Sequence, residues 1–209
     1  MINNILILSN EKILLMFNRK TASLSILSFV INTLGYNKPD SDIFFKDKNL
    51  DDFLDYKKVV IVRDPFSRIL SGYNDDLGFG IISNSFIRYK NIINKDRDQL
   101  KIERRERRER RDILDKSQRE LTFEEYVNMI CSIPDDKANQ HFKSQTYIFN
   151  EFKPDIIIKL EDMIGWSELG LPEIPHSHKS RNKIVTEITE DLKIKIKERY
   201  KNDFDILGY

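Results

Sequence analysis

The chain has 209 residues, enough for one α/β domain with a substantial core, and no Pro-, Gly- or Ser-rich linker divides it. Its 35 Lys and Arg residues nearly balance 34 Asp and Glu residues, so the net charge of +1 excludes a chain-wide attraction to nucleic acid. The single cysteine, Cys131, excludes an intrachain disulfide framework and a cysteine-based zinc site, which fits a reducing compartment.

The N-terminal stretch, MINNILILSNEKILLMF, mixes apolar residues with Asn, Ser, Glu and Lys. This pattern is typical neither of a signal peptide nor of a helix that spans a membrane. We therefore expect a soluble cytoplasmic protein with one domain over residues 1–209.

Three short apolar segments predict buried strands of one sheet, at residues 13–17, 59–63 and 155–160. Between the first two, residues 23–34 place their leucines and isoleucines on one helical stripe, and Gly35 follows where a helix commonly ends. Strand, helix and strand in this order predict a βαβ unit and hence a central parallel sheet flanked by helices.

The turn after the first strand, FNRKTASLS at residues 17–25, has the composition of a phosphate site. Lys20, the hydroxyls of Thr21, Ser23 and Ser25, and the N–H groups at the helix start could surround an anion. The glycines of a Walker A loop are absent, and a plain turn with a helix cap is the alternative interpretation.

The segment RDPFSRILSGY at residues 63–73 ends the second strand in a similar way. Asp64 is a good N-cap and Pro65 suits the first helical position, so a helix is expected directly after Arg63. Arg63 then lies at the carboxyl edge of the sheet beside a helix N-terminus, where α/β proteins bind anions. Two such turns at one edge predict a ligand with two separate anionic groups.

Further along the chain, residues 121–130 predict a helix with a capping box formed by Thr122 and Glu125, and a last helix is expected near residues 189–200. Residues 95–120 are dominated by charge, with ERRERRERR at their centre. This insertion is either a solvated charged helix or arm, or a basic surface for an anionic partner.

The first turn resembles a motif of sulfotransferases that use 3′-phosphoadenosine 5′-phosphosulfate (PAPS), in particular the membrane-type carbohydrate sulfotransferases of sulfotransferase family 2. That motif reads approximately PKxAxTS. Lys20, Ala22 and Ser25 match it, whereas Arg19 replaces the proline and Leu24 replaces the threonine.

Other segments extend this resemblance over most of the chain. Residues 63–73 match the family's second motif, approximately RDPxxRxxSxY, at every fixed position. NQHFKSQ at 139–145 is similar to HWxPQ, and IIIKLEDM at 156–163 is similar to a strand ending in Glu-Asp. YKNDFDILGY at 200–209 is similar to the closing Tyr-x-x-Asp-Phe-x-x-x-Gly-Tyr, whereas residues 95–120 have no counterpart.

The resemblance implies a single P-loop-like domain that transfers a sulfuryl group from PAPS to a hydroxyl, most plausibly of a sugar, without a metal ion. Lys20 would face the oxygen that bridges sulfate and phosphate, and Arg63 and Ser71 would bind the 3′-phosphate. The 5′-phosphosulfate cradle would comprise Lys20, Thr21, Ala22, Ser23 and Ser25. From the residues alone, an ion pair of Arg63 with Asp64 or Asp162 and a plain surface hydroxyl at Ser71 stay open.

An acceptor hydroxyl needs a base, and the chain has three histidines, His141, His176 and His178. His141 is the first choice, and a structural histidine bonded near Gln145 is the alternative. The segment PHSHKS at 175–180 is a weak metal pattern, and a loop that closes over the nucleotide is the favoured interpretation.

Two other functions remain open at this point. A P-loop-type kinase shares the architecture, although Walker glycines and a clear pair of magnesium carboxylates are absent. A non-catalytic module could instead bind polyanions through the basic residues 101–111.

Overall fold

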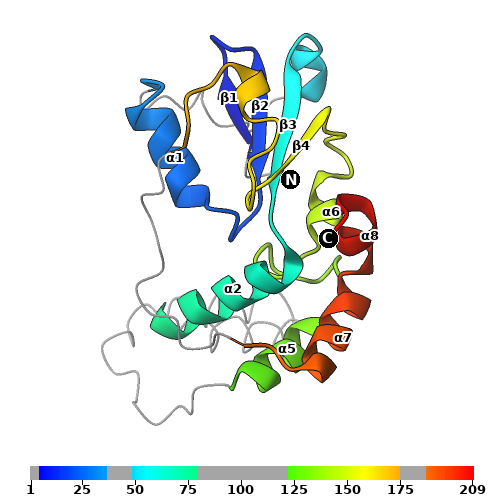
Figure 1. Ribbon diagram of the computed structural model, residues 1–209. Helices are drawn as coiled ribbons and strands as arrows, with labels where there is room; N and C mark the ends of the chain where they lie inside the picture. Colours follow the sequence, from blue (N-terminus) through cyan, green and yellow to red (C-terminus); the bar gives the residue numbers. More distant parts are fainter. Residues whose placement is uncertain (1–4, 37–48, 80–121, 175–186) are drawn as a thin grey trace, which may run out of the picture.

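The computed structural model describes residues 5–36, 49–79, 122–174 and 187–209, and its centre is a four-stranded sheet (Figure 1). The strands, in sheet order, are β1 (Ile5–Leu8), β2 (Ile13–Phe17), β3 (Lys57–Val62) and β4 (Ile156–Lys159). β2 pairs with β3 and β3 with β4 in parallel, which confirms the predicted α/β fold.

The fourth strand, β1, was not predicted. It pairs antiparallel with β2, with Ile5 opposite Met16 and Leu8 opposite Ile13, so the sheet is only mostly parallel. The polar residues that interrupt the N-terminal stretch form the turn between the two strands, and Lys12 in this turn has a left-handed φ of 53°. A four-residue apolar segment alone does not identify its partner, because the pairing depends on the neighbouring edge of β2.

Helices follow the strands and extend beyond them. They are α1 (Ser23–Asn32), α2 (Pro65–Phe79), α5 (Phe123–Cys131), α6 (Gln145–Phe149), α7 (Glu190–Arg199) and α8 (Lys201–Leu207), with short 3-10 turns η2 (Leu50–Phe53) and η4 (Ser167–Leu169). The capping box of Thr122 and Glu125 is confirmed, and α1 ends before Gly35, which has φ +77°. The helix expected near residues 189–200 is confirmed as α7. The helix α8, which was not predicted, follows it after the backbone departs from helical geometry at Tyr200.

Both faces of the sheet are covered, which explains the uninterrupted apolar strands. One face packs against Ile26, Phe29 and Val30 of α1 and against Trp166, and the other packs against Phe149 and the α6–α8 side. Residues 59–62 of β3 are therefore fully buried. This is the expected consequence of a parallel strand with helices on both sides.

A third cluster lies below the sheet in the view of Figure 1, where α2 runs beside α5 and α7. Its members include Ile69 and Tyr73 of α2 and Tyr126 of α5. Gly72 permits a close approach here, because a Cβ at this position would lie 2.7 Å from the Tyr126 hydroxyl oxygen. The helical layer thus supports the segment that follows Arg63.

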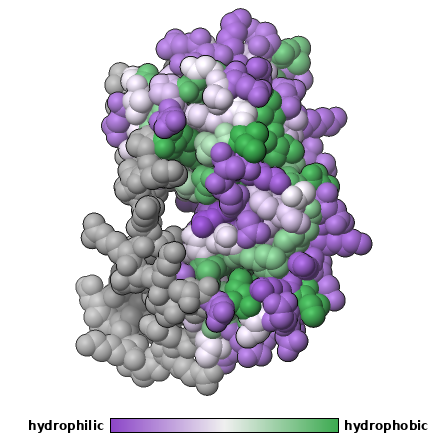
Figure 2. Space-filling view, viewed as in Figure 1, coloured by the Kyte–Doolittle hydropathy of each residue, from purple (hydrophilic) through white to green (hydrophobic). Residues whose placement is uncertain are grey.

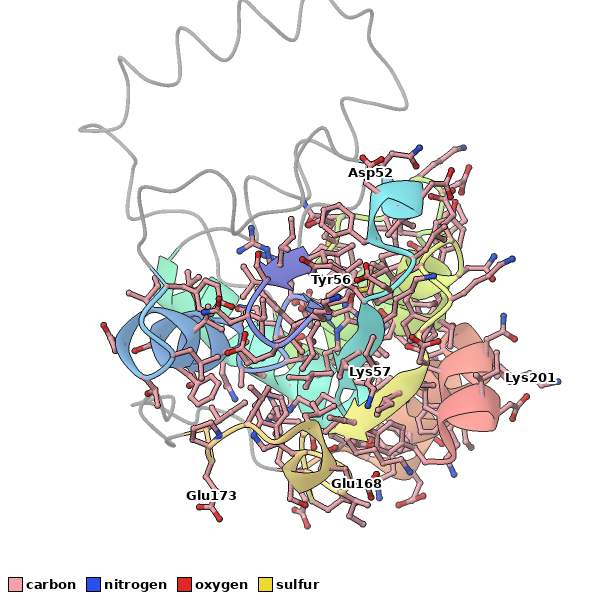
Figure 3. The ribbon with its side chains drawn as sticks, turned by 90° about the horizontal axis from the view of Figure 1, so that it is seen from above. Asp52, Tyr56, Lys57, Glu168, Glu173 and Lys201 are labelled. Carbon is pink, nitrogen blue, oxygen red and sulfur yellow. The ribbon has the colours of Figure 1, made fainter. Side chains whose placement is uncertain are left out.

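Charged side chains occupy the outer surface, as shown in Figure 3 for Lys57, Glu168, Glu173 and Lys201. Within the described ranges, no helix has the length and apolar character needed to cross a membrane. The charged insertion at 95–120 and the PHSHKS segment at 175–180 lie outside the described residues.

An ion pair ties the segment before α6 to α7. Asp135 accepts hydrogen bonds from the Arg199 guanidinium at 2.7 Å and from the Ser144 hydroxyl at 2.6 Å and its backbone N–H at 2.8 Å. Burial disfavours the charged carboxylate, but these hydrogen bonds outweigh it and lower the pKa of Asp135. The carboxylate therefore stabilises the fold above its unfolded-state pKa and ceases to do so as the pH falls through its lower folded-state pKa.

We predict that Asp135→Asn lowers the melting temperature at neutral pH, and that the difference from wild type shrinks as the pH falls below about 4, the ordinary pKa range of aspartate. Thermal unfolding between neutral and acidic pH measures this. The neighbouring exposed residue supplies the control, since Asp136→Asn should change little. A difference for Asp135→Asn that stays constant at acidic pH would contradict the assignment.

Candidate functional site

The two turns predicted to bind anions lie in contact at the carboxyl edge of the sheet. β2 and β3 are parallel and in register, with Phe17 opposite Ile61, so both strands end at the same edge. The Arg63 guanidinium Nη1 donates to the backbone carbonyl of Lys20 at 3.1 Å. This bond places the cationic side chain of one turn directly against the backbone of the other.

The first turn presents the N-terminus of α1 without a capping side chain. Ala22 occupies the N-cap with a left-handed φ of 57°, and its carbonyl accepts the first helical bond from Ile26 at 3.0 Å. No acidic residue lies in the first turn of α1. The N–H groups ahead of that first bond, which include those of Ser23 and Ser25, therefore form an electropositive helix end suited to an anion.

The hydroxyl side chains of this turn differ in their placement. Thr21 is fully buried and its hydroxyl donates to the Asn18 carbonyl at 2.7 Å, so it fixes the shape of the turn. Ser25 is also buried, whereas Ser23 and Lys20 are half-buried. Lys20 and Ala22 both have positive φ values, 70° and 57°, which bend the chain tightly around the helix end.

The second turn is held by side chains from two distant segments. The Gln145 carboxamide accepts from the Arg63 backbone N–H at 2.9 Å and donates to the Arg63 carbonyl at 2.8 Å. Glu161 accepts from the Asp64 N–H at 3.0 Å. Asp64 itself accepts from the Ser67 N–H at 2.7 Å, which confirms it as the N-cap of α2.

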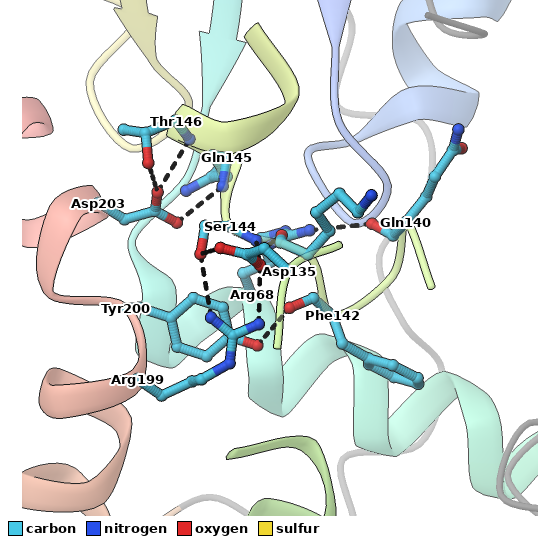
Figure 4. A network of polar contacts seen from close by, with 11 residues as sticks. Arg68, Asp135, Gln140, Phe142, Ser144, Gln145, Thr146, Arg199, Tyr200 and Asp203 are labelled. Atoms are coloured by element: carbon cyan, nitrogen blue, oxygen red, sulfur yellow. Dashed lines mark hydrogen bonds and ion pairs between the residues drawn. The ribbon is translucent and has the colours of Figure 1, made fainter. Parts of the chain in front are cut away.

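Arg68 connects the first turn to the segment that carries His141. Only 2% of its surface is exposed, and its Nε donates to the Arg19 carbonyl at 3.1 Å. The two terminal nitrogens donate to the carbonyls of Lys143 at 2.9 Å and Gln140 at 3.1 Å. Burial lowers the pKa of Arg68, yet an arginine stays protonated in proteins. Figure 4 shows the bond from this cation to the Gln140 carbonyl.

Arg68 had no predicted role, because the helical spacing of the apolar residues between Phe66 and Tyr73 places it on the opposite face of α2. The signal that could have identified it is its fixed position in the RDPxxRxxSxY pattern. The structure shows what that position does. Arg19 precedes Lys20 and Gln140 precedes His141, so one guanidinium fixes the backbone beside both predicted catalytic residues.

His141 lies in a turn rather than a helix, so the helical spacing to Gln145 that would favour a structural histidine is not present. Its backbone N–H donates to the Asn139 side chain at 3.1 Å, and its ring packs edge-on against Phe142 with 6.2 Å between ring centres. The Phe142 carbonyl accepts from the Tyr200 hydroxyl at 2.6 Å. The turn that carries His141 is thus fixed on both sides.

Ser71 is half-buried on α2, about 9 Å along the helix axis from Pro65. The described contacts bring the backbone at or beside Lys20, Arg63 and His141 into one neighbourhood, and Ser71 lies one helical turn after Arg68 on α2. Within the described part of the chain, no group of three or more His, Cys, Asp or Glu side chains is arranged to hold a metal ion.

A separate hollow lies between α2 and the start of α7. Its volume is about 270 Å³, and it is lined by Phe66, Ser67, Leu70, Glu187, Ile188 and Lys193. None of the predicted site residues lines it, so it is not the anion site.

A different hollow is visible on the face shown in Figure 2. It lies between the sheet layer and the α2 layer and has hydrophilic residues at its edge.

We predict that Arg68→Met lowers the free energy of unfolding by about 3 kcal/mol or more, because three backbone carbonyls lose a charged hydrogen-bond donor. Arg68→Lys should recover little, since one ammonium group cannot point along the three directions of a planar guanidinium. Chemical denaturation measures both, with exposed Lys201→Met as the control. A change for Arg68→Met within about 0.5 kcal/mol of wild type would contradict this role.

Residues 36–209 match the family model described as "Sulfotransferase family". No curated protein and no solved structure matches the chain. The matched range includes the Arg63 turn, the His141 segment, β4 and the closing helices, and it begins after the Lys20 turn. The match covers most of the chain and agrees with the α/β fold and the RDPxxRxxSxY segment, and the chain belongs to the sulfotransferase family.

Proposed function

We propose that this protein transfers a sulfuryl group from PAPS to a hydroxyl group of a carbohydrate acceptor. The observation that carries the proposal is the bond from the Arg63 guanidinium to the Lys20 carbonyl, which joins the two turns predicted to bind anions at one sheet edge. PAPS carries anionic groups at two separated positions, at its 5′ and 3′ ends. Two adjacent cationic turns are suited to such a ligand.

The residues present fit this donor. The α1 N-terminus has no acidic residue in its first turn and no side-chain cap, so its N–H groups favour an anion such as a 5′-phosphosulfate. The Asn18 carboxamide, at the base of this turn, is buried and has no hydrogen-bond partner among the described residues. A buried amide of this kind is satisfied when a polar ligand group or water reaches it.

PAPS supplies a sulfuryl group that is already activated by its anhydride bond to phosphate. The protein therefore needs mainly to orient the reactants and to stabilise charge, as in phosphoryl transfer. Lys20 is our candidate for the stabilising cation, since its backbone is fixed by Arg63 and by the Arg68 bond to the preceding carbonyl. A lysine whose backbone is held in place before the reaction needs less reorganisation to stabilise charge.

Arg63 is our candidate for binding the 3′-phosphate, with Ser71 as a second donor. Its guanidinium is planar and has five N–H donors, a fork geometry suited to phosphate, and its Nη1 also donates to the Lys20 carbonyl. His141 is our candidate base for the acceptor hydroxyl, because the Gln140 carbonyl beside it is bonded to the same Arg68 that fixes Arg19. The carbohydrate acceptor rests on the motif resemblance.

We predict that the product nucleotide, 3′-phosphoadenosine 5′-phosphate (PAP), binds at least roughly ten- to a hundredfold more tightly than ADP, because only PAP offers a 3′-phosphate to Arg63. Isothermal titration calorimetry measures both affinities. AMP serves as the control, since it has the 5′-phosphate alone and should bind as weakly as ADP. Equal affinities for PAP and ADP would rule out the two-site arrangement.

A second prediction separates the two turns by the kinetic step that each serves. Arg63→Ala should mainly raise KM for PAPS, since its phosphate contact is the same in the ground state and the transition state. Lys20→Ala should lower kcat by roughly 10²–10³-fold, because the charge near Lys20 grows during the reaction. Lys20→Arg should restore little activity, since a planar fork does not replace a compact ammonium.

Steady-state kinetics with PAPS and a carbohydrate acceptor test this pair. Lys57→Ala is the matched control, because Lys57 is an exposed lysine at the opposite end of β3. A Lys20→Ala enzyme with near-normal kcat at saturating PAPS would reduce the first turn to an ordinary strand-to-helix connection.

A further inference from the structure

The backbone of Arg63 is bonded on both of its polar groups by one buried side chain. Gln145 is fully buried. Its carboxamide accepts a hydrogen bond from the Arg63 N–H at 2.9 Å and donates one to the Arg63 carbonyl at 2.8 Å. A strand partner would offer the same pair of bonds in a sheet. The carboxamide therefore continues the pairing of β3 one residue beyond Val62, where the strand ends.

Gln145 is in turn fixed by a buried carboxylate of the last helix. Asp203 accepts from the Gln145 backbone N–H at 2.9 Å, and its other oxygen accepts from the Thr146 N–H at 2.9 Å and hydroxyl at 2.7 Å (Figure 4). Asp203 is fully buried, and these three donors satisfy a charge that would be costly there without them. Gln145 thus has little freedom to move away from Arg63.

We propose that Gln145, held by Asp203, is a positioning residue that sets the direction of the Arg63 side chain toward the 3′-phosphate. The inference rests on the proposed function, in which Arg63 binds that phosphate. With both backbone bonds in place, the Cα–Cβ direction of Arg63 is fixed at the sheet edge. Without them the residue is free to rotate about its backbone, and the guanidinium loses its alignment with the phosphate.

The main test is a variant that removes both bonds and keeps the length of the side chain, Gln145→Met. We expect the affinity for PAP to fall about tenfold while the affinity for ADP, which has no 3′-phosphate, changes less than about twofold. Calorimetry measures both. An equal fold-loss for PAP and ADP leaves the ratio of the two affinities unchanged. This outcome indicates general destabilisation and overturns the inference.

Thr146→Val is the matched control. It removes a buried hydroxyl that also bonds Asp203, but the two bonds between Gln145 and Arg63 remain. We expect a lower melting temperature and an unchanged ratio of PAP to ADP affinity. Gln145→Glu is a further variant, which keeps the shape of the side chain and one acceptor oxygen but offers no N–H to the Arg63 carbonyl. We expect its ratio of PAP to ADP affinity to lie between those of wild type and Gln145→Met.

Amide hydrogen exchange separates this inference from the proposed function. The Arg63 N–H should be protected in wild type and in Thr146→Val, and should exchange at least tenfold faster in Gln145→Met, with no ligand present. If wild type does not distinguish PAP from ADP, the proposed function fails, and the exchange rate still decides whether Gln145 fixes Arg63. Unchanged exchange at Arg63 in Gln145→Met overturns the positioning role.

Discussion

The buried guanidinium of Arg68 is the interaction on which the arrangement of this site depends. Its three hydrogen bonds go to backbone carbonyls of Arg19, Gln140 and Lys143, and these residues come from two loops that are far apart in the chain. Ordering two loops costs conformational entropy, and a desolvated cation costs hydration. The Arg68 guanidinium offsets both costs, because it bonds both loops and because each carbonyl dipole stabilises its charge. Removing the cation would release both loops together.

The segments that resemble sulfotransferase motifs converge on the start of α2. Gln145 bonds the Arg63 backbone and Glu161 bonds the Asp64 N–H. The closing segment holds these two in turn, because Asp203 accepts from the Gln145 N–H and the Tyr209 hydroxyl donates to Glu161 at 3.0 Å. Burial and the Glu161 carboxylate raise the pKa of Tyr209, so the hydroxyl stays a donor. These motif residues act on the backbone of the turn that is proposed to bind an anion.

The first turn carries backbone strain that these contacts maintain. Lys20 and Ala22 have φ values of 70° and 57°, a region that costs a residue with a Cβ about 1 kcal/mol or more. The bonds from Arg63 to the Lys20 carbonyl and from Arg68 to the Arg19 carbonyl oppose relaxation of the loop. Under the proposed function, such a fixed loop would favour charge stabilisation, because its N–H groups need not reorient during the reaction.

The sequence by itself determined the parallel strands, the helix that follows Arg63 with Asp64 as its N-cap, and the family. These depend on local periodicity, on capping chemistry and on the RDPxxRxxSxY motif, which is matched at every fixed position. Only the tertiary structure decided the pairing of β1 and the roles of Arg68 and Gln145. Helical periodicity indicates on which face of a helix a side chain lies, not whether distant carbonyls converge on it. Such partners lie more than forty residues away in the chain, as with Arg19 and Arg68, and only folding brings them together.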